Sequence, residues 1–509
     1  MKALRITTAL VLALGVSACG STVSLGQQSA SGSAPALGSG GNSGAGASAQ
    51  ELGPSIPAQV SGARGSASST ASAIPTSNSA DASAGASSVS SAPAGAVSGR
   101  GFTAKQAYIG VTTQKDVGTA TSALGISNLD FGDQEGQIRA VIAEINRRGG
   151  ILGRTVVPHF YDLKSADLES NRQGAAQATC AAFTQDFKVL AVVNLVAGVD
   201  VPSLYTCLSK HDTPIVSGGF IPVDSQFQRS LQSYLYQLVS PAYDQFGSVF
   251  LDRLNARQYF SGWSQSGGPA SGAAKVGIEY ADDPTDTRIA GYLKSELTHR
   301  GFAVVKTYAY DGSSVQTSTS SIGRSVLPMR GAGVTHLVFL DSAVLYFMIA
   351  AENQGYRPRY ALTSYSATAT LLQSNASAKQ LNGSLGFGWL PVSDVDAQHD
   401  PGATAGKAAC RSAMSKGSQN ISSRGAELVA YEFCDGFFMI SEAMKLAGGF
   451  STSSLRAGVS HLGSTFRSAI AFRTALRVDR PYIPGAGRDF GWDTPCSCFR
   501  YLNTSTFAF

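Results

Sequence analysis

Short apolar runs alternate with amphipathic stretches from residue 107 onward, and this alternation limits the fold more than any other feature. The run "AYIGVTT" (107–113) is rich in β-branched residues and predicts a strand. In the next segment Ile138, Val141, Ile142 and Ile145 are three or four residues apart, which predicts one apolar helix face. Strands that alternate with helices in this way form parallel sheets with helices on both faces.

The stretch "AEINRRGGILGR" (143–154) marks where that helix ends. Arg147 and Arg148 in its last turn complement the helix dipole, and Gly149 can take the left-handed conformation that closes a helix. A second strand, "TVVPHFYD" (155–162), follows. The stretch is therefore interpreted as a helix stop inside a β-α-β unit.

The same pattern continues and then restarts. In the first half we expect helices at 167–184 and 200–210 and strands at 188–195 and 213–219. The second half repeats this order. We expect helices at 241–257 and 345–356, strands at 275–281, 334–340 and 360–364, and a helix followed by a strand within 286–311. Beyond these, 383–391 looks extended, 403–416 and 425–447 look helical, and 466–509 suggests short strands and loops.

Two similar halves predict an α/β fold of two Rossmann-like lobes, with parallel sheets flanked by helices, joined by crossovers. Residues 105–509 are too many for one ordinary core, which also favours two lobes. We expect lobe 1 to comprise 102–241 plus about 390–465, and lobe 2 to comprise 242–389 plus about 466–509. Open parallel sheets bind ligands beyond the carboxyl ends of their strands, so a ligand cleft is expected between the lobes.

The N-terminus "MKALRITTALVLALGVSACG" is typical of an export signal, with a short basic region and an apolar run too short to span a bilayer. Its end, "VSAC", resembles a bacterial lipobox, which predicts a lipoprotein signal peptide at 1–18 and acylation of Cys19. The alternative is an ordinary signal cut elsewhere, with Cys19 incidental. Residues 19–101 are rich in Ser, Ala and Gly, lack aromatic residues and predict a disordered tether.

The charge distribution and the cysteine content limit which partners, cross-links and metal sites we expect. The formal net charge of +5 is not gathered into a long basic run, which argues against nucleic acid. Six cysteines remain after Cys19, an even number that favours disulfides in an exported protein. Pairing of nearest neighbours would join Cys180 with Cys207, Cys410 with Cys434 and Cys496 with Cys498. No C-x2-C and no histidine at ligand spacing accompanies them, so no metal site is expected.

No catalytic motif is evident. The segment 401–410, "PGATAGKAAC", is one residue short of a phosphate loop and has Ala408 where the loop needs Ser or Thr. The acidic "YADDPTDT" (280–287) lacks the glycine and distant Glu of a calcium loop and favours a helix N-terminus. The folded part has no G-x-S-x-G, and its histidines are scattered singly. We therefore expect no enzyme activity and no cofactor.

The expected ligand contacts lie in loops that follow strands. Free N–H groups, hydroxyls and glycines there can hold a small molecule, although each residue could instead be a turn or cap. The candidates are Thr112, Thr113, Ala197, Gly198, Ser217, Gly218, Phe220, Tyr280, Asp341, Ser364 and Tyr365.

The segment "INRRGGILGRTVVPHFYD" resembles the "iNaaGGilGr" signature of type I periplasmic binding proteins of the leucine/isoleucine/valine kind. These are the substrate-binding components of ABC importers. The order of elements, including "AYEFCDGFFMISEAMKLAGG" (430–449), is similar as well. The resemblance implies two α/β lobes that are joined by three crossovers and close on a ligand.

Positions that contact ligand in amino-acid binders of that family differ here. Val196, Ala197 and Gly198 replace the serines that meet the α-carboxylate. Thr285 lies near the place of a closing tyrosine, and Ala343 falls at the place of the Glu that pairs with the α-amino group. These differences favour another small ligand, one that is less charged or more aromatic.

Together these features predict an extracytoplasmic lipoprotein, anchored to the cell membrane, that captures an amino acid, amide or related organic solute. The resemblance implies an ABC permease as its membrane partner. Two alternatives stay open: a membrane-anchored sensor that signals through a partner, and an exported hydrolase.

Overall fold

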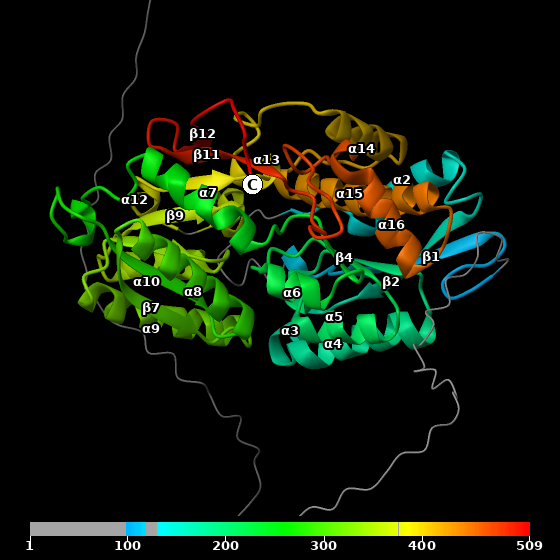
Figure 1. Cartoon of the computed structure of the whole chain (residues 1–509), viewed down its shortest axis with the longest axis horizontal. Coiled ribbons are helices and arrows are strands. Elements are labelled where there is room, and N and C mark those ends of the chain that lie inside the picture. The colour runs from blue at the N-terminus through cyan, green and yellow to red at the C-terminus, as the bar shows by residue number, and fades with distance from the viewer. Residues whose placement is uncertain (1–97, 119–129, 375) are drawn as a thin grey trace, which may run out of the picture. The chain divides into compact units, whose positions relative to one another are not determined.

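A computed structural model describes residues 98–118, 130–374 and 376–509 (Figure 1). The expected signal peptide 1–18, Cys19 and all but the last four residues of the expected tether lie outside these ranges. In the part of the chain that is described, no helix is both long and apolar enough to cross a bilayer.

The first sheet has five parallel strands in the order β2-β1-β3-β4-β5. Its strands are β1 (Gln106–Thr113), β2 (Thr155–Asp162), β3 (Ala191–Asn194), β4 (Ile215–Ser217) and β5 (Leu235–Gln237). The central strands are buried on both faces. Val192 and Ile215 belong to one apolar cluster, whereas Val193 and Val216 belong to another. A sheet covered on both sides is what the apolar strand sequences require.

Helices cover the two faces of this sheet (Figure 1). They are α2 (Gln134–Arg147), α3 (Ser165–Ser170), α4 (Arg172–Ala181), α5 (Pro202–Lys210), α6 (Ser225–Ser230), α14 (Ala405–Lys416), α15 (Arg424–Ala447) and α16 (Thr452–Leu462). Three of them, α14 to α16, come from late in the chain, so the chain returns to the first sheet after building most of the second.

Helix α2 forms as the sequence predicts. The side chain of Asp133 caps it by accepting a hydrogen bond from the Gly136 N–H, and its four spaced apolar residues are buried. The chain leaves the helix through Gly149 and Gly150, whose φ angles of 91° and 67° lie in the left-handed region. Only glycine adopts that region without strain, which explains the paired glycines.

The second sheet has a parallel part and an antiparallel extension. The strands follow the order β12-β11-β10-β9-β8-β6-β7, and β13 also pairs with β11. They are β6 (Lys275–Ala281), β7 (Ala303–Tyr310), β8 (His336–Phe339), β9 (Arg359–Thr363), β10 (Leu385–Gly388), β11 (Ala486–Asp493), β12 (Cys498–Tyr501) and β13 (Phe507–Ala508). Pairing is parallel from β7 to β10 and antiparallel from β10 to β12.

Seven helices accompany the second sheet in the described residues. They are α7 (Tyr243–Ala256), α8 (Pro284–His299), α9 (Val315–Gly331), α10 (Val344–Asn353), α11 (Thr368–Leu372), α12 (Ala378–Leu381) and α13 (Pro391–Asp394). With both sheets in place, the predicted α/β class with two similar halves is confirmed.

Some local predictions were wrong or incomplete, and helix α16 was not predicted. The single helix expected at 167–184 is broken, because Asn171 leaves helical geometry and its side chain caps α4 by accepting from Gly174 N–H. Helix α9 was not predicted, since its serines and threonines and Pro328 are poor helix formers. Its buried stripe includes Ser318, Ser321 and Ser325, so small hydroxyl residues take the place of apolar ones.

The described residues begin with a short segment that packs on the first lobe. The guanidinium of Arg100 donates to the Thr213 hydroxyl at 2.9 Å and to the Thr184 carbonyl at 3.2 Å. Gly101 is confined as well, since a Cβ there would lie 2.1 Å from Leu190 N. The end of the expected tether therefore contributes contacts to the fold.

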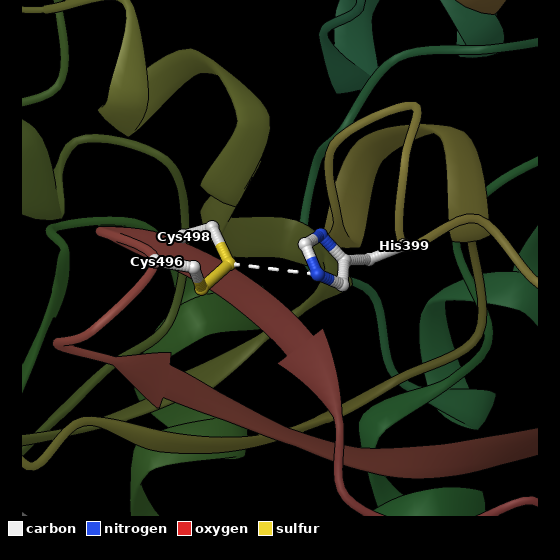
Figure 2. A group of neighbouring side chains, drawn as sticks. All are labelled: His399, Cys496 and Cys498. Carbon is white, nitrogen blue, oxygen red and sulfur yellow. Dashed lines mark hydrogen bonds between the residues drawn. A yellow bond between two sulfur atoms is a disulfide. The ribbon is translucent and has the colours of Figure 1, made fainter.

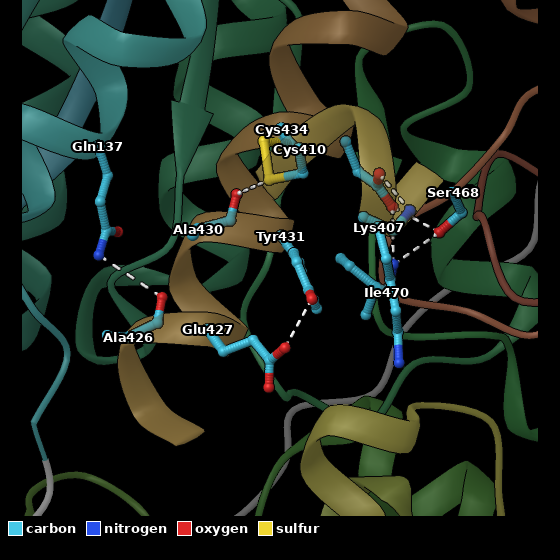
Figure 3. Close-up of a disulfide and its surroundings, with 12 residues drawn as sticks. Gln137, Lys407, Cys410, Ala426, Glu427, Ala430, Tyr431, Cys434, Ser468 and Ile470 are labelled. Carbon is cyan, nitrogen blue, oxygen red and sulfur yellow. Dashed lines mark hydrogen bonds between the residues drawn. A yellow bond between two sulfur atoms is a disulfide. The ribbon is translucent and has the colours of Figure 1, made fainter. Parts of the chain in front are cut away.

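Three disulfides are present, with the nearest-neighbour pairing that the sequence suggests. Cys180–Cys207 joins α4 to α5. Cys496–Cys498 lies at the turn between β11 and β12 (Figure 2). Cys410–Cys434 joins α14 to α15 (Figure 3). The first and third of these fasten helices that cover the first sheet.

Candidate ligand-binding site

Loops at the carboxyl ends of the two sheets touch each other. Glu169 lies on α3, just after β2, and its carboxylate accepts the N–H of Val315 at 3.0 Å and of Gln316 at 2.9 Å. These two N–H groups begin α9, which follows β7. Beside them, the Arg172 guanidinium donates to the Gly312 carbonyl at 3.0 Å. The carboxyl ends of β2 and β7 therefore face the same contact.

A second contact joins the segments that follow β4 and β6. Arg288 of α8 donates to both carboxylate oxygens of Asp224, at 2.6 and 3.1 Å, and Asp224 also caps α6. A pocket of about 230 Å³ lies beside this ion pair, lined by Asp224, Gln226, Arg229, Asp244, Arg288, Ile289 and Tyr292. Two such contacts on different strand pairs mean that the carboxyl edges of the sheets confront each other, as the cleft prediction requires.

A buried polar network occupies the first-lobe edge. The Thr112 hydroxyl donates to Asn194 Oδ1 at 2.5 Å, and Asn194 Nδ2 donates to Asp200 Oδ1 at 2.9 Å. The Ser217 hydroxyl donates to the other oxygen of Asp200. All four residues are at most 2% exposed. Thr112 and Ser217, both predicted site residues, are thus brought together and bound to the protein's own groups.

The two glycines after β4 are held against buried carboxyls. A Cβ on Gly219 would lie 1.7 Å from Asp200 Oδ2, and one on Gly218 would lie 3.1 Å from Glu432 Oε2. Burial raises the pKa of Asp200 to about 6 and that of Glu432 well above its ordinary value. Among the described residues, Glu432 Oε1 has no hydrogen-bond partner. The loop "SGGF" therefore lies over a pair of carboxyls from α15 and the β3–α5 loop.

The second-lobe edge is acidic too. Asp341, after β8, accepts from the Tyr310 hydroxyl and from Ala343 N–H at 2.8 Å, and desolvation raises its pKa. Asp286, in the first turn of α8, is 3% exposed, and its pKa is raised well above the ordinary value by burial and by the nearby Asp283 and Asp341. Carboxyls from two loops thus gather at this edge.

Ser364 and Tyr365 tie β9 to the crossovers. The Ser364 hydroxyl accepts from Trp389 N–H at 2.8 Å. The Tyr365 hydroxyl donates to the Pro241 carbonyl at 2.6 Å, and its ring stacks on Tyr243 with centroids 5.2 Å apart. Both residues are at most 1% exposed, so neither presents a free polar group in this structure.

The remaining predicted residues differ in exposure. Thr113 is buried and donates to Asp162 Oδ1 at 3.2 Å. Gly198, Phe220, Tyr280 and Asp341 are partly exposed at the strand ends, and the backbone of Ala197 lies in a short 3-10 turn. Ligand contact by these residues stays a prediction.

Sequence reasoning missed the buried acids. Asp200 ends the stretch "VAGVD" (196–200), and an acidic residue just before a helix in an apolar context was a usable signal. Glu432 left no such signal, because it comes from α15, far along the chain from Gly218.

Comparisons with solved structures identify the fold. No protein-family model matches the sequence, and no curated protein sequence is significantly similar to it. An ABC transporter substrate-binding protein from Desulfitobacterium hafniense, solved with leucine, is 14% identical with a TM-score of 0.52, covering 78% of this chain and 100% of that one. The fold is that of the type I periplasmic binding proteins, as the sequence resemblance implied.

Two further structures agree. A solute-binding protein from Rhodopseudomonas palustris, in complex with 4-hydroxybenzoate, is 13% identical with a TM-score of 0.55, covering 79% of this chain and 97% of that one. A leucine-binding protein from Thermotoga maritima is 11% identical with a TM-score of 0.55, covering 79% and 98%. The similarity thus spans nearly the whole of each of these proteins.

Proposed function

We propose that the chain is an extracytoplasmic solute-binding protein of an ABC-type importer, which captures a small molecule between its lobes by closure. The observation that carries the proposal is the pair of contacts between facing carboxyl edges, at Glu169 and at Asp224–Arg288. A ligand held at these edges would stabilise the closed arrangement by its higher affinity for that state. The proposed role includes no catalysis.

The proposed ligand is an amino acid, an amide or a related organic solute. The structural neighbours are described with leucine and with 4-hydroxybenzoate, which makes both compounds reasonable first probes. Asp200, Glu432, Asp286 and Asp341 take part in no ion pair among the described residues. Buried carboxyls without cations favour a ligand that offers hydrogen-bond donors or an ammonium group.

The membrane attachment is proposed from the sequence. Acylation of Cys19 would anchor the protein, and the Ser/Ala/Gly-rich segment would let the folded part reach a permease at the membrane surface. Mass spectrometry of the protein from its native membrane tests this point, and an unacylated Cys19 would contradict it.

Thermal unfolding of the full chain with leucine, 4-hydroxybenzoate and a panel of amides and amino acids tests the binding role. A ligand at 100 times its Kd should add about 2.7 kcal/mol to the free energy of unfolding. Asp341→Asn should reduce this gain, whereas the matched Asp252→Asn, on an exposed side chain of α7, should not. A panel without any shift, or chemical conversion of a bound compound, would count against the proposal.

A further inference from the structure

Three potential metal ligands from distant parts of the sequence meet beside the second sheet (Figure 2). His399 lies between α13 and α14, whereas Cys496 and Cys498 flank the end of the β11–β12 turn. One ligand atom of each lies within 4.8 Å of the others. The cluster is separate from the strand ends that carry the proposed ligand site.

His399 is oriented as metal-binding histidines usually are. Its Nδ1 lies 2.8 Å from Asp396 Oδ1, and a carboxylate there accepts the Nδ1 proton. The other ring nitrogen, Nε2, lies 3.9 Å from Cys498 Sγ. A carboxylate that fixes the imidazole and turns its second nitrogen toward a metal is a common supporting arrangement in metal sites.

The Cys496–Cys498 disulfide is the one that a reductant should reach first. Cys496 is exposed, whereas Cys180, Cys410 and Cys434 are fully buried. The two cysteines of the Cys496–Cys498 bridge are 2 residues apart in the sequence, whereas those of the other two bridges are 27 and 24 residues apart. The chain entropy that a disulfide removes from the unfolded state grows with loop length. The Cys496–Cys498 bridge closes the shortest loop and therefore contributes least to the free energy of unfolding.

We propose that reduction of this disulfide creates a zinc site made of Cys496, Cys498 and His399. Two molecules of a low-molecular-weight thiol each give one electron and one proton to the bridge, forming two cysteine thiols and the disulfide of the small thiol. Zn²⁺ then replaces the two thiol protons, which leave to solvent, and binds both sulfurs and His399 Nε2. A water molecule completes the four ligands.

The geometry suits zinc. Tetrahedral zinc with bonds of about 2.3 Å to sulfur and about 2.0–2.1 Å to nitrogen sets sulfur–nitrogen distances of about 3.6 Å and sulfur–sulfur distances of about 3.8 Å. The Cys498 Sγ–His399 Nε2 distance of 3.9 Å is already near that value. After reduction only the exposed Cys496 side chain has to rotate away, since Cys498 is 4% exposed and held in β12.

The site would fasten one lobe connection. Residue 399 belongs to the segment that leaves the second sheet after β10 and leads to α14, which packs on α2 and α15 of the first lobe. Zinc would join this crossover to the β11–β12 turn, whereas the disulfide joins only neighbours within the turn. A higher concentration of reducing thiols in the surroundings would therefore allow zinc to bind, and bound zinc would make this lobe connection stiffer.

Titration of the oxidised and the mildly reduced full chain with Zn²⁺, followed by competition with a coloured chelator, tests the proposal. We expect one zinc per reduced chain and none in the oxidised chain. Thiol counting should find two more thiols in the reduced chain than in the oxidised chain at that reductant concentration. Co²⁺ in place of zinc should give thiolate-to-metal charge-transfer absorption, which a site without cysteine lacks.

Variants separate the ligand roles. His399→Ala should weaken zinc binding at least 10-fold, and Asp396→Asn, which removes the supporting carboxylate, should weaken it about 10–100-fold. His461→Ala, at an exposed histidine of α16, should leave binding unchanged. Circular dichroism establishes that each variant is folded. Equal zinc binding by the oxidised chain or by reduced His399→Ala, or simultaneous reduction of all three disulfides, would overturn the proposal.

Discussion

The contact between Glu169 and the start of α9 should control how much of the protein is closed in the absence of ligand. The first N–H groups of a helix have no partner within the helix, and Glu169 accepts two of them across the lobes. Its negative charge also complements the positive end of the α9 dipole. Removing this carboxylate raises the free energy of the closed state. The free energy of the open state is unaffected, because water solvates both groups there.

The magnitude follows from these contacts. A hydrogen bond to a charged group contributes about 1.5–3 kcal/mol when buried, and less at a partly exposed site such as this one. The loss of two such weaker bonds, together with about 0.5 kcal/mol from the helix dipole, should destabilise the closed state of Glu169→Ala by about 2 kcal/mol relative to the open state. At 1.4 kcal/mol for each factor of ten, the ratio of closed to open molecules should fall about 30-fold. Glu169→Gln keeps an acceptor and should lower the ratio about 5-fold.

Distance distributions between spin labels on one exposed helix residue of each lobe measure the two populations. We expect the longer-distance population to grow in the order wild type, Glu169→Gln, Glu169→Ala. The matched control is Glu135→Ala, because Glu135 pairs with Lys115 and Arg139 inside the first lobe. A wild-type distribution in Glu169→Ala, or an equal shift in the control, would refute this reasoning.

Three further predictions concern stability in urea. Gly458→Ala should destabilise the protein by about 1–3 kcal/mol, because the new Cβ would lie 1.9 Å from the Ala443 carbonyl oxygen, whereas Gly323→Ala in open space on α9 should be neutral or stabilise by up to about 1 kcal/mol. Replacing the Cys410–Cys434 pair by alanines should cost about 3–4 kcal/mol, while replacing the Cys496–Cys498 pair should cost less than about 2 kcal/mol. Burial raises the pKa of Asp435 from 3.8 to about 7, so this carboxyl ionises at a lower pH in the unfolded chain than in the folded one. The free energy of unfolding therefore falls as pH rises through that interval, by about 4 kcal/mol at most. An unchanged pH dependence of stability in Asp435→Asn would contradict this.

The sequence predicts the parts of the fold whose residues bury one face at a regular spacing. Helix α2 has its apolar stripe, its acidic cap and its glycine exit within one short stretch, so local pattern and tertiary packing agree. Helix α9 disagrees with its local pattern, because Ser325 on its inner face is held by the hydroxyl bond that it donates to Glu279 at 2.7 Å. A buried acid in β6 therefore supports a helix that the segment's own residues do not indicate.

Glycine in a binding loop shows how far the candidate site could be read from the sequence. The pair Gly218 and Gly219 correctly indicates that something approaches the backbone closely. What approaches Gly219 in this structure is Asp200 from the preceding loop, and what approaches Gly218 is Leu195 together with Glu432 from α15. A glycine in the sequence indicates that another group lies close to the backbone, but it does not identify that group. The same residues would be required by a ligand and by the protein's own carboxyls, so only the three-dimensional neighbours distinguish the two.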